Sequence, residues 1–343
     1  MPERWREIAG AGGWRLEPGP QNAITDVAGV RVGHAQARSG ERTGVTVVAP
    51  PALPAAAAAR AVNGTGELTS KLEMDERGAI ETPVYLCGTH AVGAVYEAAV
   101  AASGRGPDDV VIPVVGECDD GDMADSRTVV GADVEAALAA LGEEVGEGSI
   151  GAGTGMSCFD FPGGIGTASR RVDEYAVGVL LLCNFGDREY LDLLGTRLQP
   201  ATDPRESQGS CIAVCATDAP LGPHQLRRLA LRPLLGLARA GSYAAEGSGE
   251  IGLAFATGEA SPPDTGAVPG GAGSGVPVAV APAAGGADRA LLNRCFAAAW
   301  EAAHEAVLNC LVAARPAERR DGSIQDAFPI EQVRGLARER GLV

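Results

Sequence analysis

Short, continuous apolar runs recur along the whole chain. GVTVVAP (44–50) and VGVLLLCNF (177–185) are typical of buried strands, because both faces of such a strand meet a core. VYLCGTHAVGAVYEAAVAA (84–102) predicts a strand that turns into an amphipathic helix. Similar patterns predict further strands at 23–34, 110–117, 211–217 and 276–282.

Longer segments show the 3.6-residue spacing of helices. We expect helices at 132–145 and 223–240, the second kinked at Pro233 because proline has no N–H to donate. Residues 287–314 show the clearest helical period in the chain.

Glycine, proline and polar residues separate these elements. The segments 148–156 and 162–170 are rich in glycine and are assigned no element, whereas 196–210 is predicted as a surface loop and 258–275 as a low-complexity loop. Strands and helices alternate without a clean break or an internal repeat. We therefore expect one α/β domain spanning residues 1–343.

The charge narrows the class of partner. A formal charge of −16 and a pI near 4.7 argue against nucleic acid and anionic membrane, which both attract basic surfaces. Such a surface either favours a partner with a free amine or serves only solubility. The N-terminus MPERWREIAGAGGW contains no apolar stretch of the signal-peptide kind, which favours a cytoplasmic location.

The cysteines and histidines give no sign of a metal or a disulfide framework. None of the eight cysteines forms a CxxC pair, and several lie in apolar runs such as CIAVC. They are typical of reduced core residues in a cytosolic protein. The four histidines are scattered and form no HExxH, so we predict no metal.

Several familiar catalytic motifs are missing from the sequence. There is no GxxxxGK[ST] loop for phosphates, GAGTGM lacks the GxGxxG spacing, and no serine has glycine at both −2 and +2. The four histidines leave a Ser-His-Asp triad possible, although no local motif marks one. A serine that supplies its own base also stays open.

The stretch LGLARAGSYAAEGSGEIGLAFATG (235–258) has two interpretations. Gly241 is a common way to end a helix, with Ser242 starting an ordinary turn. Alternatively, the Gly241–Ser242 bond is cut and Ser242 becomes a new N-terminus. Its α-amino group, with a pKa of about 7.7–8, then serves as the base for its own hydroxyl.

Several motifs, in order along nearly the whole chain, resemble the DmpA family of L-aminopeptidase/D-amidase-esterases and β-peptidyl aminopeptidases, which cut themselves before a serine or threonine. The motifs are PGPQNAITDVAGVRVGH, VNGTGELTS, GTHAVGAVYEA, IPVVGECDDGDMAD, PGGIGTASR, VGVLLLCNFGDRE, GSCIAVCATDAPLGPHQLRRLA and the stretch at 235–258. The resemblance implies an αββα sandwich of the DmpA/ornithine acetyltransferase type, an N-terminal-nucleophile hydrolase without metal or cofactor.

The resemblance also implies roles for single residues. Ser242 matches the nucleophile, so cleavage would yield chains 1–241 and 242–343. Asn184 matches the oxyanion-hole asparagine, although it is equally typical of a turn at a strand end. Glu117 matches the glutamate that holds the substrate's ammonium group, with Asp119 beside it either binding substrate or forming an acidic turn.

Weaker matches complete the predicted site. Asn63, Glu67 and Ser248 are expected to shape the loops around the nucleophile, with no chemical step assigned. Glu305 either supports the new amino group or lies on a polar helix face.

The chain departs from the family pattern at four places, which puts the substrate pocket in doubt. Asp119 stands in place of a tyrosine or small polar residue, and Met123-Ala124-Asp125 in place of Leu-Asn-Asp. Ala256 replaces a serine, and Gly88 stands where an asparagine is usual.

The predicted function is that of a cytoplasmic serine aminopeptidase or amidase that acts on small peptides or amides with a free amine. Family members form multimers, so a homo-oligomer of processed units is expected. Three alternatives stay open: an acyltransferase, an amidase that cuts internal amides, and a non-catalytic binding homologue. An amine acceptor that outcompetes water, or a stable uncut precursor, would distinguish them.

Overall fold

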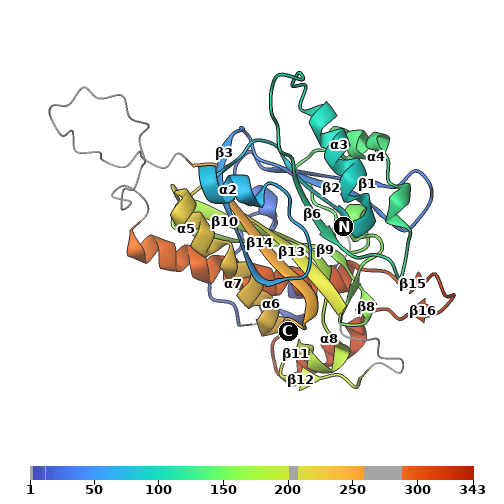
Figure 1. Ribbon diagram of the computed structural model, residues 1–343. Coiled ribbons are helices and arrows are strands. Elements are labelled where there is room, and N and C mark those ends of the chain that lie inside the picture. The colour runs from blue at the N-terminus through green and yellow to red at the C-terminus, as the bar shows by residue number, and fades with distance from the viewer. Residues whose placement is uncertain (1–2, 12, 201–207, 259–287) are drawn as a thin grey trace.

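Two β-sheets form the centre of the computed structural model, which describes residues 3–11, 13–200, 208–258 and 288–343 (Figure 1). The larger sheet has six strands, in the order β4 (Ala79–Ile80), β3 (Ala55–Gly64), β14 (Gly247–Ala256), β13 (Gln208–Thr217), β10 (Tyr175–Asn184) and β9 (Gly164–Val172). The smaller sheet has four, in the order β1 (Arg31–Gln36), β2 (Gly44–Ala49), β5 (Val84–Gly88) and β6 (Val114–Cys118). The pairs β13–β14 and β5–β6 are parallel, and the other pairs are antiparallel.

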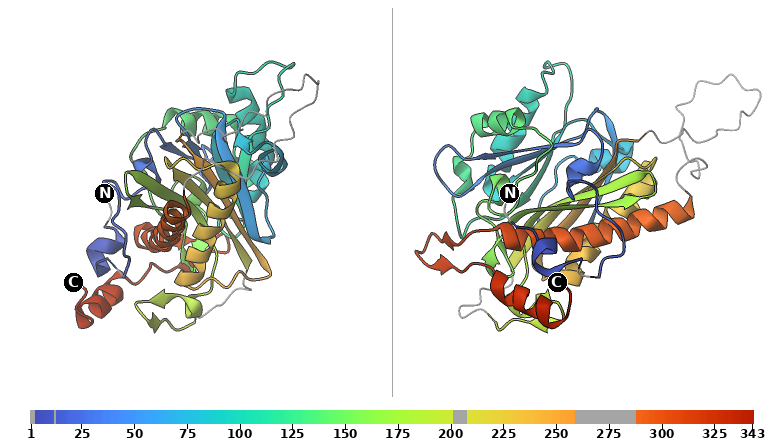
Figure 2. Two further views of the ribbon diagram at one scale, coloured as in Figure 1. Left: turned by 90° about the vertical axis from the view of Figure 1, so that its left-hand side faces the viewer. Right: turned by 180° about the vertical axis from the view of Figure 1, so that it is seen from behind.

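Helices cover the outer face of each sheet. Figure 2 shows the long helix α7 crossing the back of the larger sheet, on the side away from the smaller one. The larger sheet carries α5 (Pro223–Leu229), α6 (Leu231–Ala240) and α7 (Arg289–Ala313), and the smaller carries α3 (Val92–Ala102) and α4 (Gly131–Ala139). The remaining helices and short ladders are α1 (Trp5–Ala9), α2 (Lys71–Arg77), α8 (Ile330–Glu339), β7–β8 (Ser157–Cys158 and Phe161–Pro162), β11–β12 (Asp192–Leu193 and Thr196–Arg197) and β15–β16 (Ala317–Glu318 and Ile324–Gln325).

Three apolar clusters separate the four layers. Strand β10 shows how the sequence produces them, since its residues alternate between two cores. Leu180 and Leu182 lie in the cluster between the sheets, whereas Val179 and Leu181 lie in the cluster beneath the helices. A third cluster lies between the smaller sheet and α3 and α4. The predicted αββα sandwich is therefore confirmed.

Several predicted elements have different bounds. The helix expected at 223–240 is broken at Ala230, because Pro233 has no N–H to donate to the carbonyl of Leu229. The helix expected at 132–145 ends at Ala139, and the strand expected at 110–117 begins only at Val114. The strand predicted at 276–282 and most of the loop at 258–275 lie outside the described residues.

One glycine-rich segment, to which the sequence assigns no element, forms most of strand β9. Its glycines are needed for packing, since a Cβ on Gly166 would lie 2.0 Å from the carbonyl oxygen of Ala306 on α7. The close approach of helix and strand therefore explains a composition that resembles a loop.

The cysteines agree with the sequence prediction, because all eight are buried and unpaired. Among the described residues, no cluster of three or more potential metal ligands is present. None of the described helices combines the length and apolar character needed to cross a membrane.

Candidate active site

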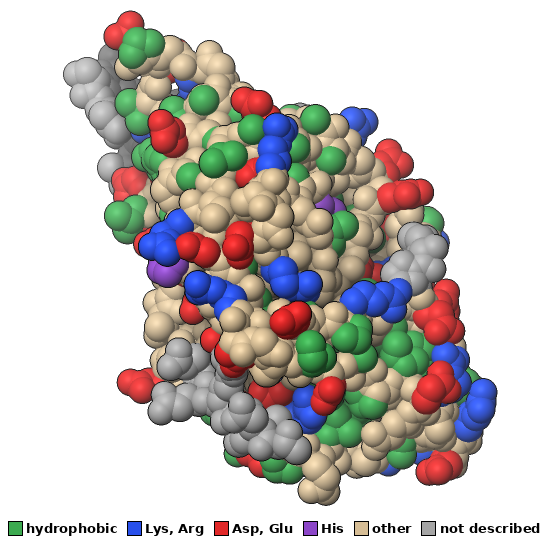
Figure 3. Space-filling view, turned by 90° about the vertical axis from the view of Figure 1, so that its right-hand side faces the viewer, with side chains coloured by type: hydrophobic (Ala, Val, Ile, Leu, Met, Phe, Trp, Pro, Cys, Tyr) green, Lys and Arg blue, Asp and Glu red, His purple; other side chains and the backbone are tan. Residues whose placement is uncertain are grey.

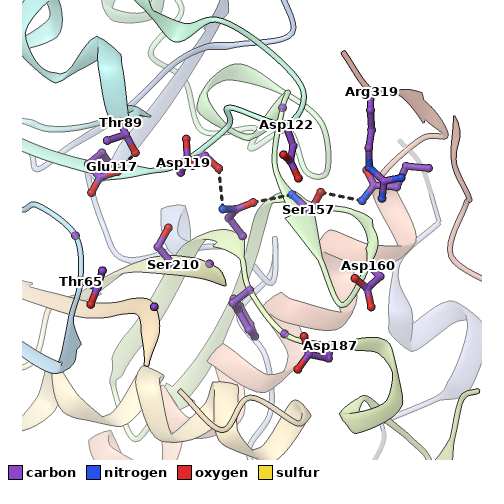
Figure 4. Close-up of a pocket in the computed structure, with 18 of the residues that line it drawn as sticks. Thr65, Thr89, Glu117, Asp119, Asp122, Ser157, Asp160, Asp187, Ser210 and Arg319 are labelled. Carbon is purple, nitrogen blue, oxygen red and sulfur yellow. Dashed lines mark hydrogen bonds between the residues drawn. The ribbon is translucent and has the colours of Figure 1, made fainter. Parts of the chain in front are cut away.

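A cavity of about 580 Å³ opens where the two sheets meet at one edge. Strand β6 contributes Glu117, β10 contributes Asn184, β13 contributes Ser210, and β14 contributes Gly247 at its first position. Figure 4 shows the labelled side chains of these strands and of the surrounding loops directed toward one another. The topology therefore brings together four strand ends that are far apart in the sequence.

Glu117 is held in place before any substrate arrives. Its carboxylate is 5% exposed, and Oε1 accepts a hydrogen bond of 2.8 Å from the amide of Glu67. Oε2 accepts from the hydroxyl of Thr89. A buried carboxylate fixed in this way is suited to bind an ammonium group.

Glu67 therefore contributes through its backbone, and its side chain is exposed. Its expected part in shaping the loops around the nucleophile stays a prediction. Asn63 does contact that loop, donating from Nδ2 to the carbonyl of Ala245 at 2.6 Å and to that of Glu246 at 3.3 Å.

Asn184 has a fixed amide orientation. Oδ1 accepts from the amide of Ser157 at 2.9 Å, and Nδ2 donates to the carbonyl of Asp119 at 2.8 Å. Because an amide NH₂ has two hydrogens, one remains for a ligand in the cavity. The geometry suits an oxyanion donor and also accounts for Asn184 as the end of a strand.

Asp119 lines the cavity, and its Oδ1 accepts from the amide of Gly121 at 3.0 Å. The acidic turn and the cavity wall are thus the same feature. Gly88 explains another departure from the family pattern, because a Cβ there would lie 2.5 Å from the carboxylate of Asp120. An asparagine side chain would not fit in this arrangement.

Ser242 lies at the end of α6, outside the lining of the large cavity. The amide of Ser242 donates to Leu237 O at 3.1 Å, and that of Gly241 to Ala238 O at 3.2 Å. Gly241 has φ +127°, and a Cβ there would lie 2.1 Å from Tyr190 O. These two bonds are those of a Schellman helix stop, which accounts for the glycine without any cleavage.

Ser248 lies at the start of β14, one residue after a glycine that lines the large cavity. Its hydroxyl donates to Glu250, which lies on the same face of the strand two residues on. Glu250 is 2% exposed, and burial raises its pKa above 4.5. A second, small space of about 10 Å³ is lined by both Ser242 and Ser248.

The turn before Ser248 has a strained backbone and is held by a hydrogen bond between backbone groups. Ala244 has φ +54°, unusual for a residue with a side chain, and the amide of Ser248 donates to Ala245 O at 2.9 Å. The sequence predicts only loop support for Ser248 and assigns no role to Glu250. The period of two in GSGE could have placed both side chains on one face.

Glu305 lies outside the cavity lining and forms buried ion pairs. Its buried carboxylate pairs with Arg170 at 2.8 Å and Arg6 at 2.7 Å, and accepts from Asn22 at 2.7 Å. These contacts tie α7 to β9 and to the N-terminal segment. The structure does not bring Glu305 to the cavity, and its side chain is not on an exposed polar face.

The four-layer fold, with a serine-bearing strand at the edge of a cavity between two sheets, is that of the N-terminal-nucleophile hydrolases. Residues 22–325 match peptidase family S58, and the chain belongs to that family. It is therefore a peptide-bond hydrolase, and the predicted resemblance to the DmpA family is confirmed.

Named relatives extend over nearly the whole chain. The β-peptidyl aminopeptidase BapA of Sphingosinicella microcystinivorans is 37% identical, covering 94% of this chain and 89% of the relative. The structure of a Burkholderia sp. β-aminopeptidase is 36% identical, with a TM-score of 0.82 over 99% of both chains. That of the L-aminopeptidase D-Ala-esterase/amidase of Ochrobactrum anthropi, described as a variant of the Ntn hydrolase fold, is 31% identical, with a TM-score of 0.81 over 98% and 99% of the two chains.

Proposed function

We propose that this protein is a self-processing serine aminopeptidase that removes N-terminal residues from short peptides or amides. The observation that carries the proposal is the cavity that holds a fixed buried carboxylate, Glu117, and an oriented amide, Asn184, beside the Gly247–Ser248 bond. The names of its relatives, which include β-peptidyl aminopeptidases, agree with this activity.

The nucleophile of the proposal is Ser248, rather than the Ser242 predicted from the sequence. Three features support Ser248: it is the second residue of a central strand, its hydroxyl has a carboxylate partner, and the residue before it lines the large cavity. Ser242 instead follows a complete helix stop. Both remain candidates that cleavage mapping separates.

Self-cleavage in this proposal proceeds by an N-to-O acyl shift. Glu250 takes the proton of the Ser248 hydroxyl as its oxygen attacks the carbonyl carbon of Gly247. The Gly247–Ser248 C–N bond breaks and its nitrogen takes up the proton, which leaves an ester. Water hydrolyses this ester, giving a carboxylate on Gly247 and a free α-amine on Ser248.

Turnover then uses that amine. A substrate binds with its ammonium group on Glu117 and its first carbonyl near the free hydrogen of Asn184 Nδ2. The α-amine of Ser248, with a pKa of about 7.7–8, takes the hydroxyl proton during attack and passes it to the departing amine. Asn184 stabilises the oxyanion, and water then releases the acyl group from Ser248.

Intact mass under denaturing conditions tests the proposal, on wild type and on the Ser248→Ala and Ser242→Ala variants. We expect chains 1–247 and 248–343 from wild type and from Ser242→Ala, and one uncut chain from Ser248→Ala. Hydrolysis of aminoacyl amides, measured in parallel, should follow the same pattern. Chains 1–241 and 242–343, lost only in Ser242→Ala, would restore the original assignment, and uncut wild type without hydrolysis would overturn the function.

Location and assembly are part of the same proposal. Eight buried, unpaired thiols are typical of a reducing compartment, which supports the cytoplasm. Leu235 and Trp300, exposed by 46% and 36% on α6 and α7, support an interface between processed units. Native mass measurement of the processed protein tests the oligomer.

A further inference from the structure

The cavity has an uneven distribution of charge. Among its described lining residues, one permanent cation, Arg319, faces five carboxylates: Glu117, Asp119, Asp122, Asp160 and Asp187. Figure 3 views the side of the molecule where β15 and β16 lie, and there acidic and basic side chains are interspersed. The excess of carboxylates is therefore a property of the cavity and not of a uniformly acidic face.

Arg319 reaches the cavity from the β15–β16 hairpin. Arg320 and Gln325 fix this hairpin on the rim: the amide of Arg320 donates to Asp122 O at 3.1 Å, and Gln325 Nε2 donates to Ser157 Oγ at 2.8 Å. The guanidinium of Arg319 makes one hydrogen bond to a described residue, to Ser323 Oγ at 3.3 Å. Most of its five donors are thus available to a ligand.

Glu117 and Arg319 lie at opposite ends of the site in Figure 4. Between them lie Asp119 and Ser157, which Asn184 bridges by its two hydrogen bonds. The order along the cavity is therefore carboxylate, oxyanion donor and guanidinium. A short peptide presents its groups in the same order: ammonium, first carbonyl and terminal carboxylate.

We propose that Arg319 binds the C-terminal carboxylate of the substrate, so that this enzyme prefers peptides of two or three residues with a free carboxylate. The proposal rests on the proposed function and adds its substrate class. A guanidinium matches a carboxylate with two parallel hydrogen bonds. Without it, the surrounding carboxylates would repel a charged C-terminus.

A structural role for Arg319 predicts something different. If the guanidinium served only to balance its acidic neighbours, its loss would lower activity on every substrate equally. The discriminating quantity is therefore the preference between an aminoacyl-glycine and the matching aminoacyl-glycinamide. The two differ only in the charge of the C-terminal group.

The experiment compares processed wild type with Arg319→Gln, using whichever aminoacyl group wild type cleaves fastest. We expect wild-type kcat/KM to be at least about ten-fold higher for the free acid, and Arg319→Gln to lose or reverse that preference. Cleavage of the amide should change much less than cleavage of the free acid. Arg315→Gln, which removes an exposed charge just before the hairpin, is the matched control and should keep the wild-type preference.

Binding of analogues with CH₂–NH in place of the scissile amide, measured by calorimetry, makes the result independent of turnover. Tighter binding of the acid analogue by wild type, lost in Arg319→Gln, supports the proposal even if nothing is hydrolysed, in which case only the proposed function fails. Equal hydrolysis and equal binding of acid and amide by wild type would overturn the proposal and leave the function intact. A parallel fall for both substrates in Arg319→Gln would also overturn it.

Discussion

Two Gly-Ser dipeptides lie six residues apart in the sequence, Gly241–Ser242 (the first step) and Gly247–Ser248 (the second step). They have the same two residues but different structural surroundings. At Gly241–Ser242 the backbone closes a helix with two hydrogen bonds, and the glycine is needed because a side chain would strike Tyr190 O. At Gly247–Ser248 the backbone leaves a strained turn and enters a central strand beside the cavity.

A Gly-Ser dipeptide alone therefore does not identify a nucleophile; the side chains and cavities around the serine in the folded structure do. The serine of the first step accepts a local hydrogen bond from Ala244 N at 3.3 Å. The serine of the second step donates to a buried carboxylate. Of the two, the second alone has both a proton acceptor for its serine and a residue that lines the large cavity.

The largest effect is expected from the proposed oxyanion donor, Asn184, which lines the large cavity beside Gly247 and not the small space lined by Ser242. Asn184→Asp keeps the acceptor for Ser157 N but loses the NH₂ donors. We expect turnover to fall by about 10²–10³-fold, as for other oxyanion-hole deletions. Steady-state kinetics on processed protein measures this. Turnover within three-fold of wild type, in a variant with the wild-type melting temperature, would contradict the assignment.

A smaller effect, with a distinctive pH dependence, is expected at Glu250. Burial raises its pKa above 4.5, and only the deprotonated form accepts the Ser248 proton. Self-cleavage of wild type should therefore slow as the pH falls through a value above 4.5. Glu250→Gln should cleave about 10²-fold more slowly and lack this limb of the profile.

Refolding from urea at a series of pH values, followed on denaturing gels, gives these rates. Glu246→Gln, an exposed residue of the same turn, is the control and should behave like wild type. If the rate of self-cleavage in Glu250→Gln still falls at low pH as it does in wild type, another group takes the Ser248 proton.

The smallest effect is expected for a substitution at Gly241, in the first step, and it should change the stability of the fold without changing the cleavage site. Gly241→Ala places a Cβ 2.1 Å from Tyr190 O at φ +127°, so we expect a loss of about 2–4 kcal/mol in the free energy of unfolding. Urea denaturation in the uncut Ser248→Ala background measures it. Gly335→Ala, where a Cβ meets nothing within 4 Å, should instead be neutral or slightly stabilising. With Ser248 intact, Gly241→Ala should still be cut at residue 248; loss of the cut would return the first step to the mechanism.

Much of the fold could be predicted from the sequence because the central strands are apolar on both faces. Strand β10 is one such run, and its alternate residues reach two cores. Strand β9 was missed for the opposite reason. Its glycines make room for α7, and that reason becomes visible only when the helix is in place.

The site was predictable where the sequence alone places a polar side chain at the end of a strand. Glu117 and Asn184 lie at the ends of buried strands, and the structure brings them to one cavity. Glu305 could not be placed, because its partners Arg6 and Arg170 come from segments separated from it by more than a hundred residues. Arg319 was missed because a two-residue ladder in a polar tail carries no periodic signal.

The central position of β14 determines what becomes of the two halves after the proposed cut. Every residue from Gly249 to Ala256 is aligned with β13 on one side and with β3 on the other. The new amino terminus thus emerges from a strand locked between two neighbours of the other chain. The two fragments therefore stay associated after the cut. They cannot exchange with fragments of another molecule unless the hydrogen bonds of both ladders break at once, so each mature enzyme consists of two fragments of the same synthesised chain.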